Sequence, residues 1–364
     1  MTKTLIYIAI GLVCTMAVFS CKTKDNTTLS VGEVKYVTAF PKKIEIKAVP
    51  VELGEKGMGT DWIANIMDTT LILNRHGGPV YFEAYSTNTH RHTGSFINKG
   101  RGPGEYPESP KILNSNDSLF NLCITDTYSG EIKFTTLNSL IEYDTTGLRK
   151  YAPKGAPGGI NQLLFINDTL KIYNNKGIVM GKSGPQLESK LSIYNDTTLL
   201  RNIPLFDFSH RKKIPDTRIL GTSISVSFNS QILFCAFSAF NQINVYSLSG
   251  GENFTICFSP EKELYTLAKV EGQSRFSFKE FYSSSTCSDK YLFALYYGYG
   301  RYKMEVEKSV LPVIQVFANN GTPVAELSLK EKLQSIKYDP LHHRLYGMTS
   351  EETLFYYELN GIIP

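Results

Sequence analysis

The stretch MDTTLIL, residues 67–73, places a polar turn directly before an apolar run, and this combination recurs along the chain. Its counterparts are NDSLFNL (116–122), NDTLKIY (167–173), FNSQILF (228–234), SDKYLFAL (288–295) and YDPLHHRLYGM (338–348). Asp and Asn side chains start turns by hydrogen-bonding the local backbone, and the apolar runs that follow are typical of strands. The residues that open these strands lie 48 to 62 positions apart; they are Leu71, Leu119, Leu170, Ile232, Leu292 and Leu345. Repeats near this length with several strands each are typical of β-propellers.

The rest of each unit reads as strand, tight polar turn, strand, which makes four strands per unit. Examples are QINVYSLSGGENFTICF (242–258) and VIQVFANNGTPVAELSL (313–329). The sixth unit is one strand short, because TLFYYELNGIIP (353–364) supplies only one, but the strand-like runs EVKYV (33–37) and KKIEIKAV (42–49) precede the first unit. We therefore predict an all-β fold in which residues 33–364 form a six-bladed β-propeller, its ring closed by an N-terminal strand pairing with the last blade. A β-sandwich or two stacked β domains is the alternative.

The first twenty residues predict export from the cytoplasm. Lys3 precedes an apolar run, LIYIAIGLVCTMAVFS (5–20), which is shorter than the roughly 20 residues of a membrane-spanning helix. We therefore interpret residues 1–20 as a signal peptide. The sequence AVFSC (17–21) resembles the lipobox of bacterial lipoproteins, which implies that Cys21 carries a diacylglycerol. A soluble secreted protein with an incidental cysteine is the alternative.

Residues 21–32 are small and polar, so we expect a flexible tether between the lipid and the folded body. Lys22 does not suggest retention in the inner membrane, so we expect the outer membrane, on its periplasmic or its surface face. The net charge is only +4, and HRKK (210–213) is the one short basic run, so we expect no nucleic-acid partner. The cysteines of the body follow no metal-ligand spacing, and we expect buried free thiols, with a disulfide of undetermined pairing as the alternative; they are Cys123, Cys235, Cys257 and Cys287.

The glycine-rich stretch NKGRGPGEYP (98–107) raises the question of a nucleotide site. Its spacing is GxGxG rather than GxGxxG, and Pro107 and Pro110 prevent the helix whose N-terminus would hold a phosphate. We interpret it instead as a structural loop that crosses between blades, in which Arg101 and Glu105 pair. The residues of this loop are Gly100, Arg101, Gly102, Pro103, Gly104, Glu105 and Tyr106.

GRGPGEY (100–106) resembles a motif of the TolB-like six-bladed β-propeller lipoproteins common in Bacteroidetes. The segments VIQVFANNGTPVAELSL (313–329), SIKYDPLHHRLYGM (335–348) and FYYELNG (355–361) resemble their last two blades. The resemblance implies a propeller fold, a motif that leads from the first blade to the second, and a place in the cell envelope. It implies no activity and no catalytic residue.

The histidines do not predict a metal site. His90 and His92 form an HxH pair, and His76 belongs to the same unit, but a zinc site needs three or four ligands and no further ligand is apparent. We expect exposed turn residues there, with no metal and no cofactor. His342 and His343 fall in a loop between strands, where we expect solvent exposure. No GxSxG motif of a hydrolase is present.

Tyrosines are most dense in LYYGYGRY (295–302), which makes a possible ligand face. These tyrosines are Tyr296, Tyr297, Tyr299 and Tyr302. Aromatic residues are also ordinary strand formers, so the same pattern fits a buried strand. Two functions follow. The first is a non-enzymatic binding or scaffold protein for an envelope protein or a glycan. The alternative is a propeller enzyme, a hydrolase or lyase, acting on polysaccharide or a lactone-like substrate.

Overall fold

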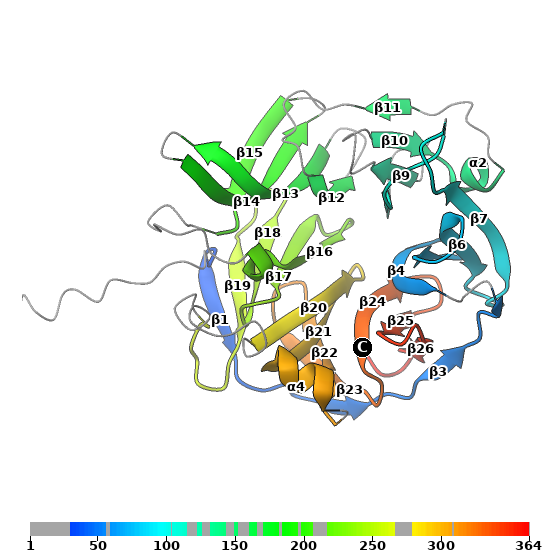
Figure 1. Cartoon of the computed structure of the whole chain (residues 1–364). Helices are drawn as coiled ribbons and strands as arrows, with labels where there is room; N and C mark the ends of the chain where they lie inside the picture. The colour runs from blue at the N-terminus through cyan, green and yellow to red at the C-terminus, as the bar shows by residue number, and fades with distance from the viewer. Residues whose placement is uncertain are drawn as a thin grey trace, which may run out of the picture.

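The computed structural model describes most of the chain after the N-terminal segment (Figure 1). The described residues are 30–55, 59–102, 104–114, 122–125, 132–142, 149–151, 160–165, 170–181, 184–195, 198–206, 217–265, 279–307 and 309–363. They form an all-β fold in which the helical elements are short. Within these ranges no helix has the length and hydropathy needed to cross a membrane. The predicted signal peptide and Cys21 lie outside the described residues.

The described strands form six sheets, five of which contain a meander of four strands that follow one another in the chain, while the sixth contains three such strands. The first three sheets are β4 (Thr60–Met67), β5 (Thr70–Arg75), β6 (Val80–Ser86) and β7 (His92–Asn98); β8 (Lys111–Asn114), β9 (Leu122–Thr125), β10 (Ile132–Thr135) and β11 (Arg149–Tyr151); and β12 (Ile160–Phe165), β13 (Leu170–Gly181), β14 (Gly184–Asn195) and β15 (Thr198–Pro204). The fourth and fifth are β16 (Thr222–Ser227), β17 (Ile232–Phe237), β18 (Gln242–Ser247) and β19 (Phe254–Phe258); and β20 (Lys279–Cys287), β21 (Tyr291–Gly300), β22 (Val313–Ala318) and β23 (Pro323–Ser328). The sixth contains β24 (Leu333–Asp339), β25 (Arg344–Thr349) and β26 (Leu354–Glu358), and its fourth strand comes from the N-terminal region.

Three N-terminal strands attach to three different sheets. β1 (Glu33–Val37) lies parallel to β19, and β2 (Lys43–Glu45) lies parallel to β23, each as a fifth strand at the outer edge. β3 (Val49–Val51) pairs antiparallel with β26, with Val51 opposite Leu354. An N-terminal strand therefore does join the last sheet, but it is 49–51 and not the run 33–37. Of the run 42–49, only Val49 takes part in that pairing.

The attachment of the chain to the folded body begins before β1. Val31, in the segment assigned to the tether, donates its N–H to Thr255 Oγ1 and accepts a hydrogen bond from that hydroxyl. The backbone at Gly32 has a φ of +56°, and a Cβ there would fall 1.8 Å from the Asn253 carbonyl oxygen. Only glycine fits such a close approach. Gly32 therefore lets the chain pass directly against the folded body at the end of the segment assigned to the tether.

The middle strands of the sheets are buried on both faces, which explains why they are nearly continuous apolar runs. β17, with the sequence ILFCAF, sends Leu233, Cys235 and Phe237 into the core it shares with the third sheet. Phe234 and Ala236 point the opposite way, into the core shared with the fifth sheet. This period-2 division of one strand between two cores is possible only where each sheet is packed face to face between two others.

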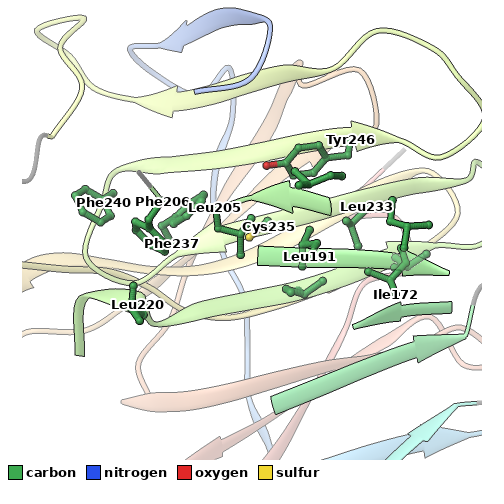
Figure 2. Close-up of a cluster of buried hydrophobic side chains, with 14 of the residues drawn as sticks. Ile172, Leu191, Leu205, Phe206, Leu220, Leu233, Cys235, Phe237, Phe240 and Tyr246 are labelled. Carbon is green, nitrogen blue, oxygen red and sulfur yellow. The ribbon is translucent and has the colours of Figure 1, made fainter. Parts of the chain in front are cut away.

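The cores connect the sheets in sequence. Side chains of the third and fourth sheets form the cluster drawn in Figure 2, which includes Leu191, Cys235 and Tyr246. Equivalent clusters join the fourth to the fifth sheet, the fifth to the sixth, and the first to the second. One further cluster joins the sixth sheet to the first, through Met348 and Leu354 against Leu71 and Tyr85. The sheets lie around a common centre (Figure 1), where β12 contacts β8, β8 contacts β4, β4 contacts β24, β24 contacts β20 and β20 contacts β16.

The turn-and-strand repeat predicted from the sequence is the hairpin between the first and second strands in five of the six sheets. Five of the six strand-opening residues lie in second strands, namely Leu71, Leu170, Ile232, Leu292 and Leu345. Leu119 lies outside the described residues. Two short helices were not predicted, α2 (Leu137–Ile141) and α4 (Arg301–Val306), because neither is long enough to show a helical period.

Candidate functional site

The glycine-rich loop connects the first sheet to the second, since it follows β7 and precedes β8. Its ends are held together by two backbone hydrogen bonds, from the Gly100 N–H to the Tyr106 carbonyl oxygen and from the Tyr106 N–H to the Asn98 carbonyl oxygen. The loop thus crosses between sheets, as the sequence predicts. No helix follows the glycines in this described stretch, so the geometry of a phosphate-binding loop is lacking here.

Glu105 organises the interior of this loop. Its carboxylate accepts the N–H of Gly102 at 2.8 Å, whereas the predicted pairing with Arg101, an exposed residue, is not found among the described contacts. Gly100 has a φ of +154°, and a Cβ at this position would fall 1.9 Å from Glu105 Oε2. The motif therefore needs glycine at Gly100 both for its backbone angle and for the close approach of a carboxylate. Pro103 lies outside the described residues.

Tyr106 anchors the loop in the core between the first two sheets. Its ring is buried with Phe96 and Ile112. Its hydroxyl accepts a hydrogen bond from Lys133 Nζ at 3.0 Å, and the same ammonium lies 4.7 Å from the centre of the ring. These contacts account for the motif by packing and local hydrogen bonds.

The structure divides the four tyrosines of 295–302. Tyr297 is buried and donates its hydroxyl proton to the Leu333 carbonyl oxygen, and Tyr296 is largely buried against Phe258 and Tyr282. Tyr299 and Tyr302 are exposed, at 42% and 60% of their surface. The predicted ligand face is therefore reduced to the second pair, where β21 ends and α4 begins.

The three histidines of the first unit do not converge. His76 Nδ1 lies 3.0 Å from Asp61 Oδ1, and His92 Nε2 lies 2.7 Å from Glu83 Oε2. His90 has a φ of +55°, so it sits in a turn and the strand alternation that would align it with His92 does not apply. In the described part of the chain no three His, Cys, Asp or Glu side chains are grouped so as to hold a metal ion.

His92, Glu83 and Ser95 lie in mutual contact, but not in the arrangement of a catalytic triad. Ser95 Oγ and Glu83 Oε2 both contact the same nitrogen of His92, Nε2, and the Ser95 hydroxyl donates directly to the buried Glu83. A triad needs the acid on one ring nitrogen and the nucleophile on the other. Arg75 Nη1 donates to the second oxygen of Glu83 at 2.7 Å, so the cluster is a paired buried carboxylate.

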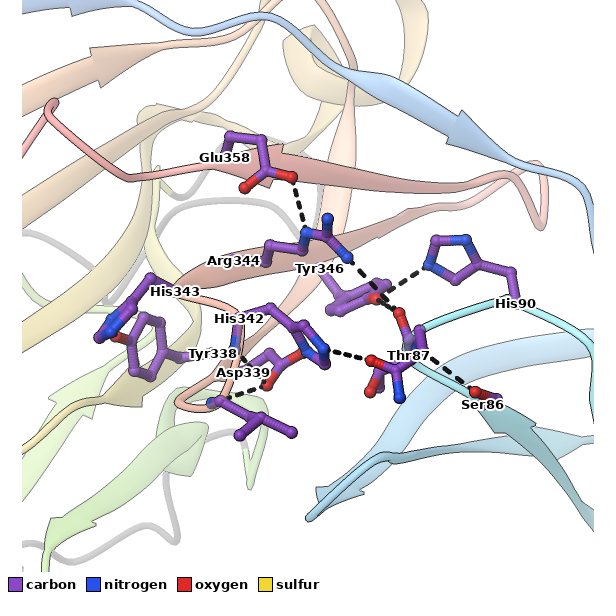
Figure 3. Close-up of polar contacts among 12 residues, drawn as sticks. Ser86, Thr87, His90, Tyr338, Asp339, His342, His343, Arg344, Tyr346 and Glu358 are labelled. Atoms are coloured by element: carbon purple, nitrogen blue, oxygen red, sulfur yellow. Dashed lines mark hydrogen bonds and ion pairs between the residues drawn. The ribbon is translucent and has the colours of Figure 1, made fainter.

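The seam between the last and first sheets contains a second polar cluster, drawn in Figure 3. The fully buried Asp339 accepts hydrogen bonds from the backbone N–H groups of Leu341 and His342, and its Oδ2 lies 2.7 Å from His342 Nδ1. His342 Nε2 contacts the side-chain oxygen of Asn88, in the β6–β7 turn of the first sheet. His342 therefore links two sheets. The sequence predicts solvent exposure at this position instead.

Two more contacts cross the same seam. The Thr87 carbonyl oxygen accepts the Tyr346 hydroxyl at 3.3 Å, and His90 Nε2 lies 2.9 Å from that hydroxyl. Burial lowers the pKa of His90 below its usual value of 6.5, and the nearby Arg344 adds to this effect. His90 is thus favoured as the neutral imidazole at the seam.

A cavity of about 650 Å³ lies where the first strands of several sheets meet. Its walls come from β4, β8, β16, β20 and β24, together with the β16–β17, β20–β21 and β24–β25 turns and the C-terminal residues 359–363. Cavities of this size hold small molecules or single sugar units. This cavity was not anticipated from the sequence.

Hydroxyl groups and one amine line this cavity. Ser285 Oγ lies 3.2 Å from Ser225 Oγ, so these two hydroxyls satisfy each other. Lys337, on β24, lines the cavity and is half-buried. Burial lowers the pKa of Lys337 from its usual value, and the neighbouring Cys287 has the opposite, smaller effect. At the rim, the Tyr338 hydroxyl lies 2.9 Å from His343 Nδ1.

Three cysteines of the body are free thiols, Cys235, Cys257 and Cys287. This confirms the expectation for these three, whereas the side chain of Cys123 lies outside the description. Burial raises the pKa of Cys257 and of Cys287 to about 12. All three are therefore protonated and unreactive near neutral pH.

Comparison with known proteins identifies no family for the chain. No protein-family model matches the chain, and no curated protein matches it. Solved structures that it resembles include the WD40 repeats of RRP9, at 10% identity over 88% of this chain and 99% of the other with a TM-score of 0.47. A DUF4221-family member from Bacteroides vulgatus is 14% identical over 92% and 98% with a score of 0.49, and U3-55K is 10% identical over 88% and 100% with a score of 0.48. Likenesses this distant carry no argument about family or activity.

Sequence reasoning missed the cavity because its walls come from segments far apart in the chain. One local signal was available. In the strand SIKYD (335–339), Lys337 interrupts the run between Ile336 and Tyr338. A lysine inside a strand of a β-rich fold indicates either an exposed face or a polar cavity, and only the packing of the strands distinguishes them.

Proposed function

We propose that the chain is a six-bladed β-propeller, anchored by lipid in the bacterial envelope, that binds a ligand without catalysing a reaction. The proposal of a closed ring is supported by the six sheets of four or five strands and by the cluster that joins the sixth sheet to the first. The pairing of β3 with β26 would complete the last blade with an N-terminal strand, the arrangement that protects a propeller from exposing a strand edge.

The anchor and the location are proposals from the sequence alone. The segment AVFSC (17–21) resembles a lipobox, so Cys21 would be the first residue of the mature protein and the point of lipid attachment. Membership of the TolB-like lipoprotein family rests on GRGPGEY (100–106), with the outer membrane as the expected location.

The central cavity is the observation that carries the binding function. Its volume of about 650 Å³ suits a small ligand or one residue of a longer chain. Its potential nucleophiles are not activated, because Cys287 is held as a thiol and Ser225 contacts Ser285 rather than a base. A concave polar site without an activated nucleophile is better suited to binding than to covalent catalysis.

A glycan is the ligand class that the lining favours. Serine hydroxyls match sugar hydroxyls as donors and acceptors. The exposed rings of Tyr299 and Tyr302, elsewhere on the surface, offer apolar faces on which a sugar could stack. A protein partner held by the loops is the other occupant that we propose to test.

Cross-linking in intact cells tests this function. The lipidated protein would be cross-linked, solubilised and recovered, with a Cys21→Ala form as the control for anchoring. Recovery of one envelope protein or polysaccharide in a stoichiometric amount, dependent on Cys21, is the expected result. Recovery of the chain alone from both forms would contradict the binding function.

The cavity rim gives one reason to keep an enzyme as the second candidate. Tyr and His both serve as general acids or bases, and the Tyr338 hydroxyl and His343 form such a pair. Burial raises the pKa of Tyr338, so its hydroxyl would act as an acid. A hydrolase or lyase would cleave polysaccharide or a lactone-like substrate, and Tyr338→Phe would abolish that cleavage while leaving binding intact.

A further inference from the structure

Lys337 is a half-buried cation for which the described residues provide no counter-ion. It lines the central cavity from β24, next to Cys287 at the end of β20. No hydrogen bond or ion pair joins its ammonium to any residue in the described ranges. A charge removed from water without a partner is costly, and proteins normally pair such a group or use it to bind a ligand.

Two acidic side chains close to Lys337 in the sequence or the lining, Asp289 and Asp339, form hydrogen bonds with other residues. Asp289, at the exposed rim, accepts a hydrogen bond from Asn229 Nδ2 at 2.6 Å. Asp339, two residues beyond Lys337, holds His342 and two backbone N–H groups on the side of the seam. The other Asp, Glu, Lys or Arg side chains of the lining are Asp289 and Lys290, and both are exposed. The interior of the cavity therefore carries one unneutralised positive charge.

We propose that the central cavity binds an acidic sugar, with the sugar carboxylate held by the Lys337 ammonium and the sugar hydroxyls held by cavity serines. This inference rests on the glycan-binding function and names its ligand class. One cation calls for one negative charge, which a uronic acid supplies and a phosphate dianion exceeds. Ser225 and Ser285 lie together on adjacent first strands, so their hydroxyls can exchange partners with a sugar.

The state of the amine supports this assignment. Burial lowers the pKa of Lys337, so the empty cavity disfavours the charged form. A carboxylate placed beside the amine would restore the charged form and raise this pKa. At pH values where the amine of the empty cavity is partly deprotonated, ligand binding should therefore draw a proton from solvent, and the affinity should fall as the pH rises toward the usual lysine value of 10.5.

A matched pair of probes tests the inference, methyl β-D-glucuronide and methyl β-D-glucoside, which differ by the carboxylate. Titration calorimetry on the full-length protein in detergent should give about tenfold tighter binding of the glucuronide, as expected for one charge-assisted hydrogen bond. Lys337→Met should remove this preference, since methionine keeps the length of the side chain without its charge. Lys290→Met, the matched control at the rim, should leave it within about twofold.

The outcomes separate this inference from the function on which it rests. Equal affinity for both sugars, unchanged in Lys337→Met, would overturn the role of Lys337 and leave glycan binding in place. Tighter binding of an acidic peptide, N-acetyl-aspartyl amide, would overturn the sugar class. Failure of both sugars to bind would overturn the inference, while the cross-linking experiment still judges the binding function. Proton uptake by the unaltered protein, measured in two buffers of different ionisation enthalpy, supports the inference independently of any variant.

Discussion

Replacing His342 by alanine should destabilise the protein by opening the seam between the last and first sheets. His342 Nδ1 lies 2.7 Å from Asp339 Oδ2, and its other ring nitrogen contacts Asn88 on the first sheet. The Asp339 side chain is fully buried, whereas that of His342 is 20% exposed. His342→Ala therefore leaves a buried carboxylate with fewer donors and removes a contact between segments 254 positions apart.

The size of this destabilisation depends on the hydrogen bonds that Asp339 retains in the variant. Removing one partner of a buried ion pair typically costs about 3–5 kcal/mol. Asp339 retains the backbone N–H groups of Leu341 and of residue 342, so the cost at the carboxylate should be nearer to that of one hydrogen bond to a charged group, about 1.5–3 kcal/mol. The Asn88 contact is exposed and adds about 0.5 kcal/mol. A total of about 2–3.5 kcal/mol corresponds to a change of roughly thirty- to 370-fold in the unfolding equilibrium.

The single tryptophan makes the assay specific to the seam. Trp62 lies on β4 of the first sheet, on the other side of the seam from His342. Urea unfolding followed by Trp62 fluorescence should show a lower midpoint for His342→Ala. His343→Ala is the matched control, because its ring contacts only Tyr338 among the described partners, and it should cost less than about 1 kcal/mol. Equal midpoints for the two variants would refute the assignment of the seam to His342.

Three further predictions concern local geometry and charge. Gly100→Ala should destabilise the protein by about 1–3 kcal/mol, because the alanine Cβ would meet Glu105. Gly104→Ala should cost about 1 kcal/mol, because Gly104 has a φ of +78° but open space around it. Thermal unfolding compares the two variants. His90 has a lowered pKa, so the unfolded state binds more protons, and stability should be lost as the pH falls below 6.5; His90→Gln should flatten this part of the stability curve measured by urea unfolding. Lys337→Met should raise the free energy of unfolding at neutral pH, since it removes an uncompensated cation, and the gain should shrink as the pH rises toward 10.5; a steady gain across that range would contradict the charge as its cause.

The sequence by itself determined the class and rhythm of this fold. Turn formation by Asp and Asn and the alternation of side chains along a strand depend on neighbouring residues only, so MDTTLIL and its counterparts identify the second strand of five of the six sheets. The role of the glycine-rich loop was also predictable, because proline after the glycines excludes a helix by local sterics. The hydrogen bonds inside that loop were not predictable. Glu105, the predicted partner of Arg101, instead accepts a hydrogen bond from the Gly102 N–H.

Tertiary structure decided everything that depends on which strands meet. Three N-terminal strands of similar character attach to three sheets, and only the packing assigns 49–51 to the last of them. The same packing buries Tyr297, leaves Tyr302 exposed, and brings His342 to Asn88 across the seam. The same packing places the charge of Lys337 in the cavity. Burial and the lack of a partner are properties of the space around a side chain, and that space is enclosed by strands from five sheets.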